Sequence, residues 1–277
     1  MIFDEVLTDM NDKCKNPKKD DYVKDGLVYC GNCYTPKQCK VNTEHASFLV
    51  YCMCKCETNE YEKAQKLFKE QENALLISRY RNTGFSDAQM QKWTFENDNG
   101  ENPKIMEKAK RYVANWHEML EKNIGLCFFG NVGTGKTFAA ACIANALIDQ
   151  GIRVIMTDFS RILNDMQSFD VRDKNGYIDD ICGCDLLILD DLGAERQSEY
   201  ALQICEQVID KRVKEKKPLI LTTNISLETI RNPPDVKYAR MYSRILEMTV
   251  PVQSAGTDKR SRTHEDNMKW AKEYFSG

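Results

Sequence analysis

The clearest chemistry in this sequence belongs to a short glycine-rich segment. Residues 130–137, GNVGTGKT, match G-x-x-x-x-G-K-[ST], follow an apolar run that predicts a strand, and open a segment that predicts a helix. Glycines let the backbone turn so that its N–H groups surround phosphate oxygens, and the following helix adds the positive end of its dipole. We therefore expect ATP to be held by Gly130, Gly133, Thr134, Gly135, Lys136 and Thr137.

Two acids at the end of the apolar run LLIL complete a predicted magnesium site. Asp190 and Asp191 lie at the carboxyl end of a predicted buried strand, the edge where parallel sheets bind ligands. With Lys136 at the β- and γ-phosphates, the Thr137 hydroxyl and Asp190 are expected to ligate Mg²⁺. Asp191 would orient or deprotonate the attacking water, with capping of the next turn as the alternative. Glu195 is a less favoured base.

A polar strand end follows the apolar run PLIL. Thr222, Thr223 and Asn224 stand where the parallel sheet would meet the γ-phosphate. We expect Asn224 to hydrogen-bond the attacking water. Because Asn is also a common turn residue after a strand, this assignment depends on the neighbouring motifs.

Clustered cysteines near the start of the chain predict a metal site. Cys30 and Cys33 have the C-x2-C spacing that presents two thiolates to one ion, and YCMCKCE adds three cysteines about twenty residues later. So short a segment, broken by Gly and Pro, cannot bury a large core, which favours a structural Zn²⁺ over free thiols. The predicted ligands are Cys30, Cys33, Cys54 and Cys56, with Cys52 left open and Cys14, Cys39 and His45 ranked lower.

Composition narrows the class of protein. The 277 residues carry a formal net charge of −3, so DNA binding can rest only on local basic patches. No run approaches the roughly 18 apolar residues of a membrane-spanning helix, and the start MIFDEVLTDMNDK is acidic, unlike a signal peptide. We expect a cytoplasmic protein with no membrane partner, in which the five cysteines beyond the cluster are small core residues.

Short apolar runs alternate with helix-forming stretches from residue 125 onward, which is typical of an α/β fold with a parallel sheet flanked by helices. The predicted strands lie within 125–130, 153–159, 185–191, 218–224 and 247–253, and the predicted helices near 59–81, 104–122, 136–151, 160–167 and 199–214. We divide the chain into a zinc module (1–57), a helical connector (58–103) and a P-loop domain (104–277).

The segments GNVGTGKT, LLILDDLGAE, LTTN and YARMYSRILEM, in this order, resemble the DnaC/DnaI-type helicase loaders of the AAA+ ATPases, including prophage forms. The resemblance continues upstream through WTFEND and the cysteine-rich start. It implies a loader that places a replicative DnaB-type helicase on single-stranded DNA, binds the helicase through residues 1–57 and assembles as a homo-oligomer. IstB-type transposition helper ATPases resemble the large domain equally well, and the amino-terminal unit favours the loader over the helper.

The resemblance also implies roles for basic residues. In such loaders an arginine after the sensor asparagine reaches the γ-phosphate of the neighbouring subunit, and Arg244 matches it. Arg240, one turn earlier, is the competing candidate, and either could be a solvated surface residue. Arg260, in the basic cluster 259–262, resembles the sensor-two position that contacts the same ATP.

The resemblance implies DNA contact between residues 158 and 180, where the available residues are Arg161, Arg172, Lys174, Phe159, Phe169 and Tyr177. The alternative is that these charges are only solvated and that the aromatic rings belong to the core. Two departures from the AAA+ pattern are Asp191 in place of the usual Glu and a helical lid that is missing or reduced to residues beyond Gly256. Both imply weak hydrolysis used as a switch. The alternative functions are a small P-loop kinase and a zinc-bearing DNA-binding regulator.

Overall fold

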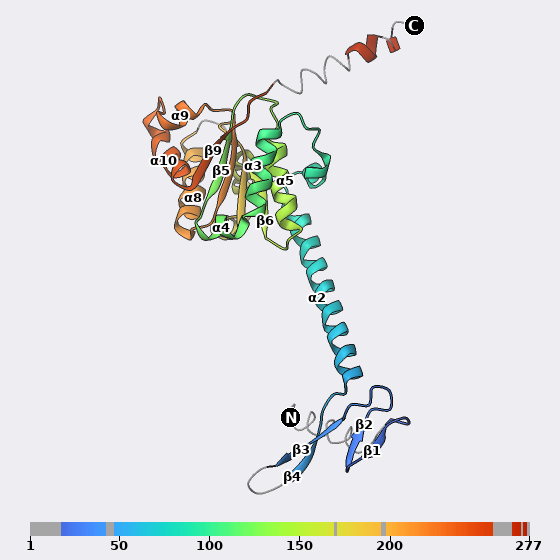
Figure 1. The fold of residues 1–277 in the computed structure, drawn as a ribbon. Helices are drawn as coiled ribbons and strands as arrows, with labels where there is room; N and C mark the ends of the chain where they lie inside the picture. Colours follow the sequence, from blue (N-terminus) through green and yellow to red (C-terminus); the bar gives the residue numbers. More distant parts are fainter. Residues whose placement is uncertain are drawn as a thin grey trace. The chain divides into compact units, whose positions relative to one another are not determined.

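The computed structural model describes residues 18–42, 47–168, 171–194, 198–256, 268–272 and 274–275, and the chain forms two compact units, Met1–Ala74 and Leu75–Gly277 (Figure 1). Each unit is described by itself. Within the described residues, no helix combines the length and the apolar character needed to cross a bilayer. The division at residues 57 and 103 stays a prediction.

The first unit contains two small antiparallel sheets. Strand β1 (Tyr22–Lys24) pairs with β2 (Leu27–Tyr29), and β3 (Gln38–Asn42) pairs with β4 (Ser47–Tyr51). Helix α2 (Lys55–Thr83) then begins and contains the helix predicted at 59–81.

The interior of the first unit is polar as well as small. Lys37 is only 7% exposed, and its ammonium lies 2.9 Å from an Asp21 carboxylate oxygen and 3.3 Å from a Glu57 oxygen. Glu57 also accepts a hydrogen bond from the Tyr51 hydroxyl at 2.7 Å. Burial opposes ionisation of Glu57, but the hydrogen bonds from Tyr51 and the Cys54 amide prevail and lower its pKa to about 2.

The second unit is a five-stranded parallel sheet, as the sequence predicts (Figure 1). The strands lie in the order β6-β7-β8-β5-β9, and every neighbouring pair is parallel. Their bounds are Gly125–Phe129 (β5), Val154–Asp158 (β6), Leu186–Leu192 (β7), Leu219–Thr223 (β8) and Thr249–Gln253 (β9).

Helices cover both faces of this sheet, which explains why its strands read as continuous apolar runs. Alternate residues of one strand belong to different cores: Ile188 packs with one face, and Leu187 and Leu189 with the other. The Ile188 face is covered by α3 (Pro103–Ala114), α4 (Trp116–Glu121) and α5 (Lys136–Ile148). The other face is covered by α6 (Phe159–Gln167), α7 (Lys174–Cys182), α8 (Glu199–Glu215), α9 (Leu227–Arg231) and α10 (Ala239–Met248).

The single helix predicted at 104–122 is wrong in one respect, because the chain forms two helices there. Asn115, with φ −109° and ψ 24°, ends α3 and begins α4. Its side-chain amide donates to the Arg111 carbonyl at 2.7 Å, which offers the backbone an alternative to continued helix. Short 3-10 helices are η1 (Ala88–Lys92), η2 (Phe95–Asn97) and η3 (Val236–Tyr238).

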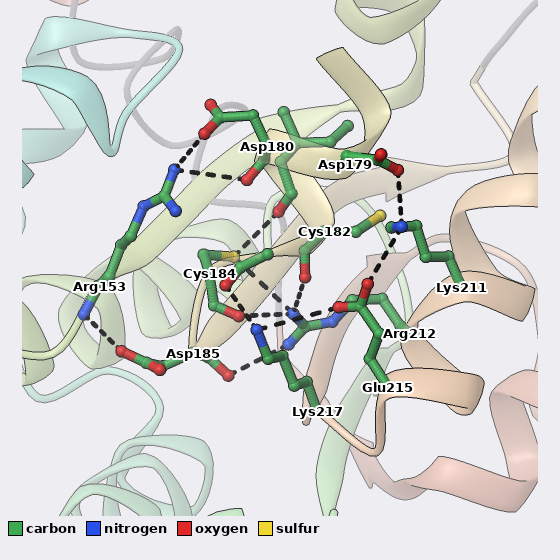
Figure 2. A network of polar contacts seen from close by, with 12 residues as sticks. Arg153, Asp179, Asp180, Cys182, Cys184, Asp185, Lys211, Arg212, Glu215 and Lys217 are labelled. Carbon is green, nitrogen blue, oxygen red and sulfur yellow. Dashed lines mark hydrogen bonds and ion pairs between the residues drawn. The ribbon is translucent and has the colours of Figure 1, made fainter. Parts of the chain in front are cut away.

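A buried arginine ties the ends of several elements together (Figure 2). Arg212 on α8 is 0% exposed, and its guanidinium donates to the carbonyls of Cys182 and Cys184 at 2.7 Å each and of Asp185 at 3.2 Å. A further bond reaches the Pro218 carbonyl, just before β8. The guanidinium thus fixes the end of α7 and the starts of β7 and β8, and burial lowers its pKa.

Candidate functional site

The predicted phosphate loop connects β5 to α5, and its glycines adopt backbone angles that other residues avoid. The φ values are +140° at Gly130, +74° at Gly133 and +89° at Gly135. A Cβ atom at Gly130 would lie 2.3 Å from the Ser254 carbonyl oxygen, so the close approach requires glycine. Gly135 is the N-cap of α5, which directs the unpaired N–H groups of the helix towards the loop.

Residues far away in the sequence brace this loop. The Asn102 side-chain amide, before α3, donates to the Thr134 carbonyl at 3.0 Å and to the Ser254 hydroxyl at 3.1 Å. Ser254, after β9, donates to the same Thr134 carbonyl at 3.0 Å. The Thr134 hydroxyl itself bonds the Asn131 carbonyl at 2.9 Å, so this buried threonine supports the loop from within. Asn102 and Ser254 were not predicted, since only the folded chain brings them to the loop.

Lys136 lies over the loop and is nearly buried. Its ammonium donates to the carbonyls of Gly130 at 2.9 Å and Asn131 at 2.7 Å, and to Asn224 Oδ1 at 2.7 Å. These acceptors are neutral. Anionic phosphate oxygens would form stronger, charge-assisted bonds with the same ammonium.

Asp190 and Thr137 form the pair expected of a magnesium site. The Thr137 hydroxyl donates to Asp190 Oδ1 at 2.9 Å, and the Thr222 hydroxyl donates to the same oxygen at 2.5 Å. Burial raises the pKa of Asp190, the two hydroxyl bonds oppose that shift, and the charges of Asp191 and Asp158 add to it. A carboxylate held among other acids at the end of a buried strand suits a divalent cation, which would offset its desolvation.

Asp191 is directed into the same cavity by a break in the strand. Neighbouring strand residues normally point to opposite faces, but the β7–β8 register shifts between Leu189 and Leu192, and Asp191 has φ +55°. Its amide donates to the Thr222 hydroxyl at 2.9 Å, and its carboxylate accepts from Asn224 Nδ2 at 3.0 Å. Asn224 therefore joins Lys136 to Asp191, and the structure brings the predicted residues of the two strand ends and the loop together.

The cavity above these residues has a volume of about 460 Å³. Its polar end is formed by loop residues together with Asp190, Asp191, Thr222 and Asn224, and its other lining residues include Met90, Trp93, Val132 and Phe138. The rings of Trp93 and Phe138 lie 6.0 Å apart between centroids. The buried Asn145 of α5 holds this wall, since its amide donates to the carbonyls of Met90 and Trp93 at 2.9 Å each. This wall was not predicted, because Trp93 stands in a segment rich in turn residues and no local pattern marks it as part of a site.

The four predicted metal ligands lie together in the first unit. The sulfurs of Cys30, Cys33, Cys54 and Cys56 are all within 4.8 Å of one another, and Cys52 lies outside this group. Two sulfurs at 2.3 Å from one zinc in a tetrahedron are separated by roughly 3.8 Å, so the donor set fits Zn²⁺. Alternate positions of a strand share one face, so a strand through residues 52–56 would have left all three cysteines available. Instead β4 ends at Tyr51 and Cys56 already belongs to α2.

Electrostatics of this cysteine cluster also suit a cation. Burial raises the pKa of Cys54 to about 12, whereas a hydrogen bond with Thr35 lowers the pKa of Cys33 to about 5. Four thiols this close cannot all ionise unless a cation neutralises them. Cys39 is exposed and outside the group, while Cys14 and His45 lie outside the described residues. The five cysteines of the second unit are buried, as predicted.

Two of the predicted arginines, Arg240 and Arg244, do not line the nucleotide cavity. Arg240 and Arg244 are on α10 and form ion pairs with Asp210 of α8. Arg260 and the acid Glu195 lie outside the described residues.

Within the segment expected to contact DNA, the structure places one of the three rings in the core. Phe159 is 1% exposed and packs in the core, so it offers no ring for stacking. Tyr177 is partly buried, and its hydroxyl donates to Asp165 at 2.8 Å. Arg161 remains on the surface and donates to the Ser86 carbonyl at 3.1 Å, and Phe169 lies outside the described residues.

A phosphate loop that opens a helix, with paired acids and an asparagine at the adjacent strand ends of a parallel sheet, defines an ATP-binding P-loop protein of the AAA+ fold class. Comparison with known families agrees. A family model described as IstB-like ATP binding protein matches residues 57–265, and the chain belongs to this family.

Individual relatives are replication proteins. The chain is 32% identical to the replicative helicase loader DnaC of Escherichia coli K12 over 44% of this chain and 50% of that protein. It is 28% identical to the replicative helicase loader DnaI of Bacillus subtilis 168 over 50% of this chain and 48% of that protein. The chain thus spans about half the length of the curated relatives it matches. A crystal structure of DnaI superposes with a TM-score of 0.54 and 25% identity, covering 65% of this chain and 99% of that one.

Proposed function

We propose that this protein is an ATP-dependent loader that places a replicative DnaB-type helicase on single-stranded DNA. The observation that carries the proposal is the continuous chain of contacts from Lys136 through Asn224 to Asp191. These contacts link the Lys136 ammonium, which would bind phosphate, to the Asp191 carboxylate, which would orient water. A switch that senses the γ-phosphate needs such a link. The names of the relatives supply the kind of work that such a switch performs.

Each residue of the cavity has a role in this proposal. The backbone of Gly130, Gly133, Thr134 and Gly135 surrounds the phosphates, and Lys136 neutralises their charge. Thr137 and Asp190 would hold Mg²⁺, which when bound would supply positive charge against the phosphates. Asp191 orients the attacking water, and Asn224 holds Asp191 in place at 3.0 Å.

The apolar wall takes the adenine ring. Trp93 and Phe138 offer aromatic faces on which the adenine ring can stack, and the flexible side chain of Met90 can pack against its edge. The cavity volume of about 460 Å³ lies within the range of small-ligand sites.

Hydrolysis is slow in the isolated chain. Asp191 is shorter by one methylene than glutamate, so its carboxylate reaches less far towards the γ-phosphate. Arg244 completes the site in trans, where a guanidinium stabilises charge on the transferred phosphoryl group. Because Arg244 acts on the ATP of a neighbouring subunit, ATP turnover depends on assembly into a homo-oligomer. Arg260 contacts the phosphates of the same chain's ATP.

The zinc module, residues 1–57, holds a structural Zn²⁺ and binds the helicase. Cys30, Cys33, Cys54 and Cys56 hold the ion, and the buried Lys37 pairs support the surrounding hairpins. Protein binding is favoured over DNA binding for this unit because acidic residues are interspersed among its lysines.

The test is co-purification of the full chain with the replicative helicase, with and without ATP. We expect the wild-type chain to capture helicase and the captured amount to change when ATP is added. In Lys136→Ala the captured amount should not depend on ATP. Capture of a transposase in place of helicase would refute the loader function in favour of an IstB-type helper. Phosphorylation of a small acceptor would support a kinase instead.

A further inference from the structure

Two exposed arginines and one carboxylate form a cluster where α8 packs against α10. Arg240 and Arg244 lie one turn apart on α10, with side chains 66% and 42% exposed. Asp210 of α8 lies beside both and is 20% exposed. None of the three lines the nucleotide cavity.

Asp210 uses a different oxygen for each arginine. Its Oδ2 accepts a hydrogen bond from Arg240 at 2.6 Å, and its Oδ1 lies 3.8 Å from Arg244 Nε. Arg244 Nη1 also donates to Glu247 at 2.8 Å. The hydrogen bonds orient each guanidinium, and the longer ion pair places Arg244 beside Asp210. A guanidinium has five N–H donors, so each arginine keeps donors for another anion.

The part of α8 that carries Asp210 is fixed by the core. The preceding residues of α8, Val208 and Ile209, are 0% exposed in the core that α8 shares with α10. Partly exposed ion pairs contribute little to stability because water screens them. The consequence of this pair is therefore geometric: it holds two long, mobile side chains in one arrangement.

We propose that Asp210 is a positioning residue that presents Arg240 and Arg244 together to the γ-phosphate bound by a neighbouring copy of the chain. The inference rests on the proposed trans role of Arg244. It also gives Arg240 a place: the two arginines act as one preorganised anion receptor, and the carboxylate between them fixes their separation.

The experiment is subunit mixing in the full chain with single-stranded DNA and ATP. The Asp191→Asn chain serves as a silent subunit that keeps its P-loop, and phosphate release is measured from limiting wild-type chain as silent chain is added. We expect silent chain to stimulate the wild-type rate. Silent chain that also carries Asp210→Asn should stimulate at least about tenfold less, in line with the effect of small misplacements. Asp210→Glu should restore part of the effect.

Two measurements separate positioning from loss of structure. The Asp210→Asn chain should keep the melting temperature and the ATP affinity of the parent, since Asp210 does not line the cavity and its ion pairs are with partly exposed arginines. The matched control is Asp179→Asn, which removes a comparable partly exposed ion pair to Lys211 of α8 at 2.6 Å and should leave full stimulation.

The outcomes distinguish the two levels of the proposal. If Asp210→Asn silent chain stimulates as well as or better than its parent, while Arg244→Ala silent chain does not stimulate, the role of Asp210 is refuted and the trans arginine stands. If the unaltered silent chain fails to stimulate, or removal of both arginines changes nothing, the trans role itself is refuted, and the inference with it.

Discussion

Replacing Arg212 by Leu removes the cation that joins α7, β7 and β8 (Figure 2). Four backbone carbonyls, those of Cys182, Cys184, Asp185 and Pro218, then lose their donor. A buried acceptor left without a partner costs about 1–3 kcal/mol. Arg212 is fully buried, so water cannot reach all four carbonyls without opening the packing.

One effect acts in the opposite direction. Burial disfavours the charged guanidinium, as its lowered pKa indicates, and Nε has no hydrogen-bond partner among the described residues. Leucine relieves that cost. Because four acceptors stand against one relieved charge, we expect a net loss of about 3 kcal/mol in the free energy of unfolding of the second unit.

The assay is thermal unfolding followed by circular dichroism. A unit of this size loses roughly 2–4 °C per kcal/mol, so Arg212→Leu should lower Tm by roughly 6–12 °C. Arg212→Lys, which keeps the charge but reaches fewer carbonyls, should fall between. Lys211→Met is the matched control, since its ammonium pairs with Asp179 and Glu215 at the surface, and no change in Tm is expected. A Tm of Arg212→Leu within 2 °C of wild type would refute the reasoning.

Two further predictions concern the nucleotide and the metal. ATP binding should change the fluorescence of Trp93, and Trp93→Phe should abolish that change. The control variant Trp116→Phe should keep it, because Trp116 is buried outside the cavity. A signal that survives Trp93→Phe would place the adenine base elsewhere. Chelation or Cys54→Ser should release about one zinc per chain and unfold the first unit, with ATP affinity within about twofold of wild type because the second unit has its own core. Cys52→Ser should keep its zinc, and loss of the metal from that variant would count against the four assigned ligands.

Local pattern was enough to predict the sheet and the loop. The apolar runs, the GNVGTGKT segment and the acids after LLIL each depend on residues close together in sequence, and the structure places them as expected. The helix break at Asn115 was missed because a side chain competing with the helix for a carbonyl looks like any other polar residue in a helical run.

Long-range relations could not be predicted. Trp93 lies at the cavity, where Asn145 of α5, more than fifty residues away, holds its carbonyl. Arg212 looks like a solvated helix residue in the sequence, while its carbonyl partners lie on other elements. For Phe159 the sequence left open both stacking on DNA and packing in the core, because its position after a strand does not reveal that α6 turns the ring inward. Asp191 lines the cavity together with Asp190, but the strand break that directs it there has no signature in the sequence.

The central claim is that residues 130–137, Asp190 and Asn224 bind a magnesium nucleotide, and isothermal titration calorimetry of the zinc-loaded full chain tests it most directly. We predict uptake of one ATP or ADP per chain in the presence of Mg²⁺. Lys136→Ala should weaken that uptake at least about tenfold, the cost of one charge-assisted contact. Failure of the folded wild-type chain to take up either nucleotide would contradict the account.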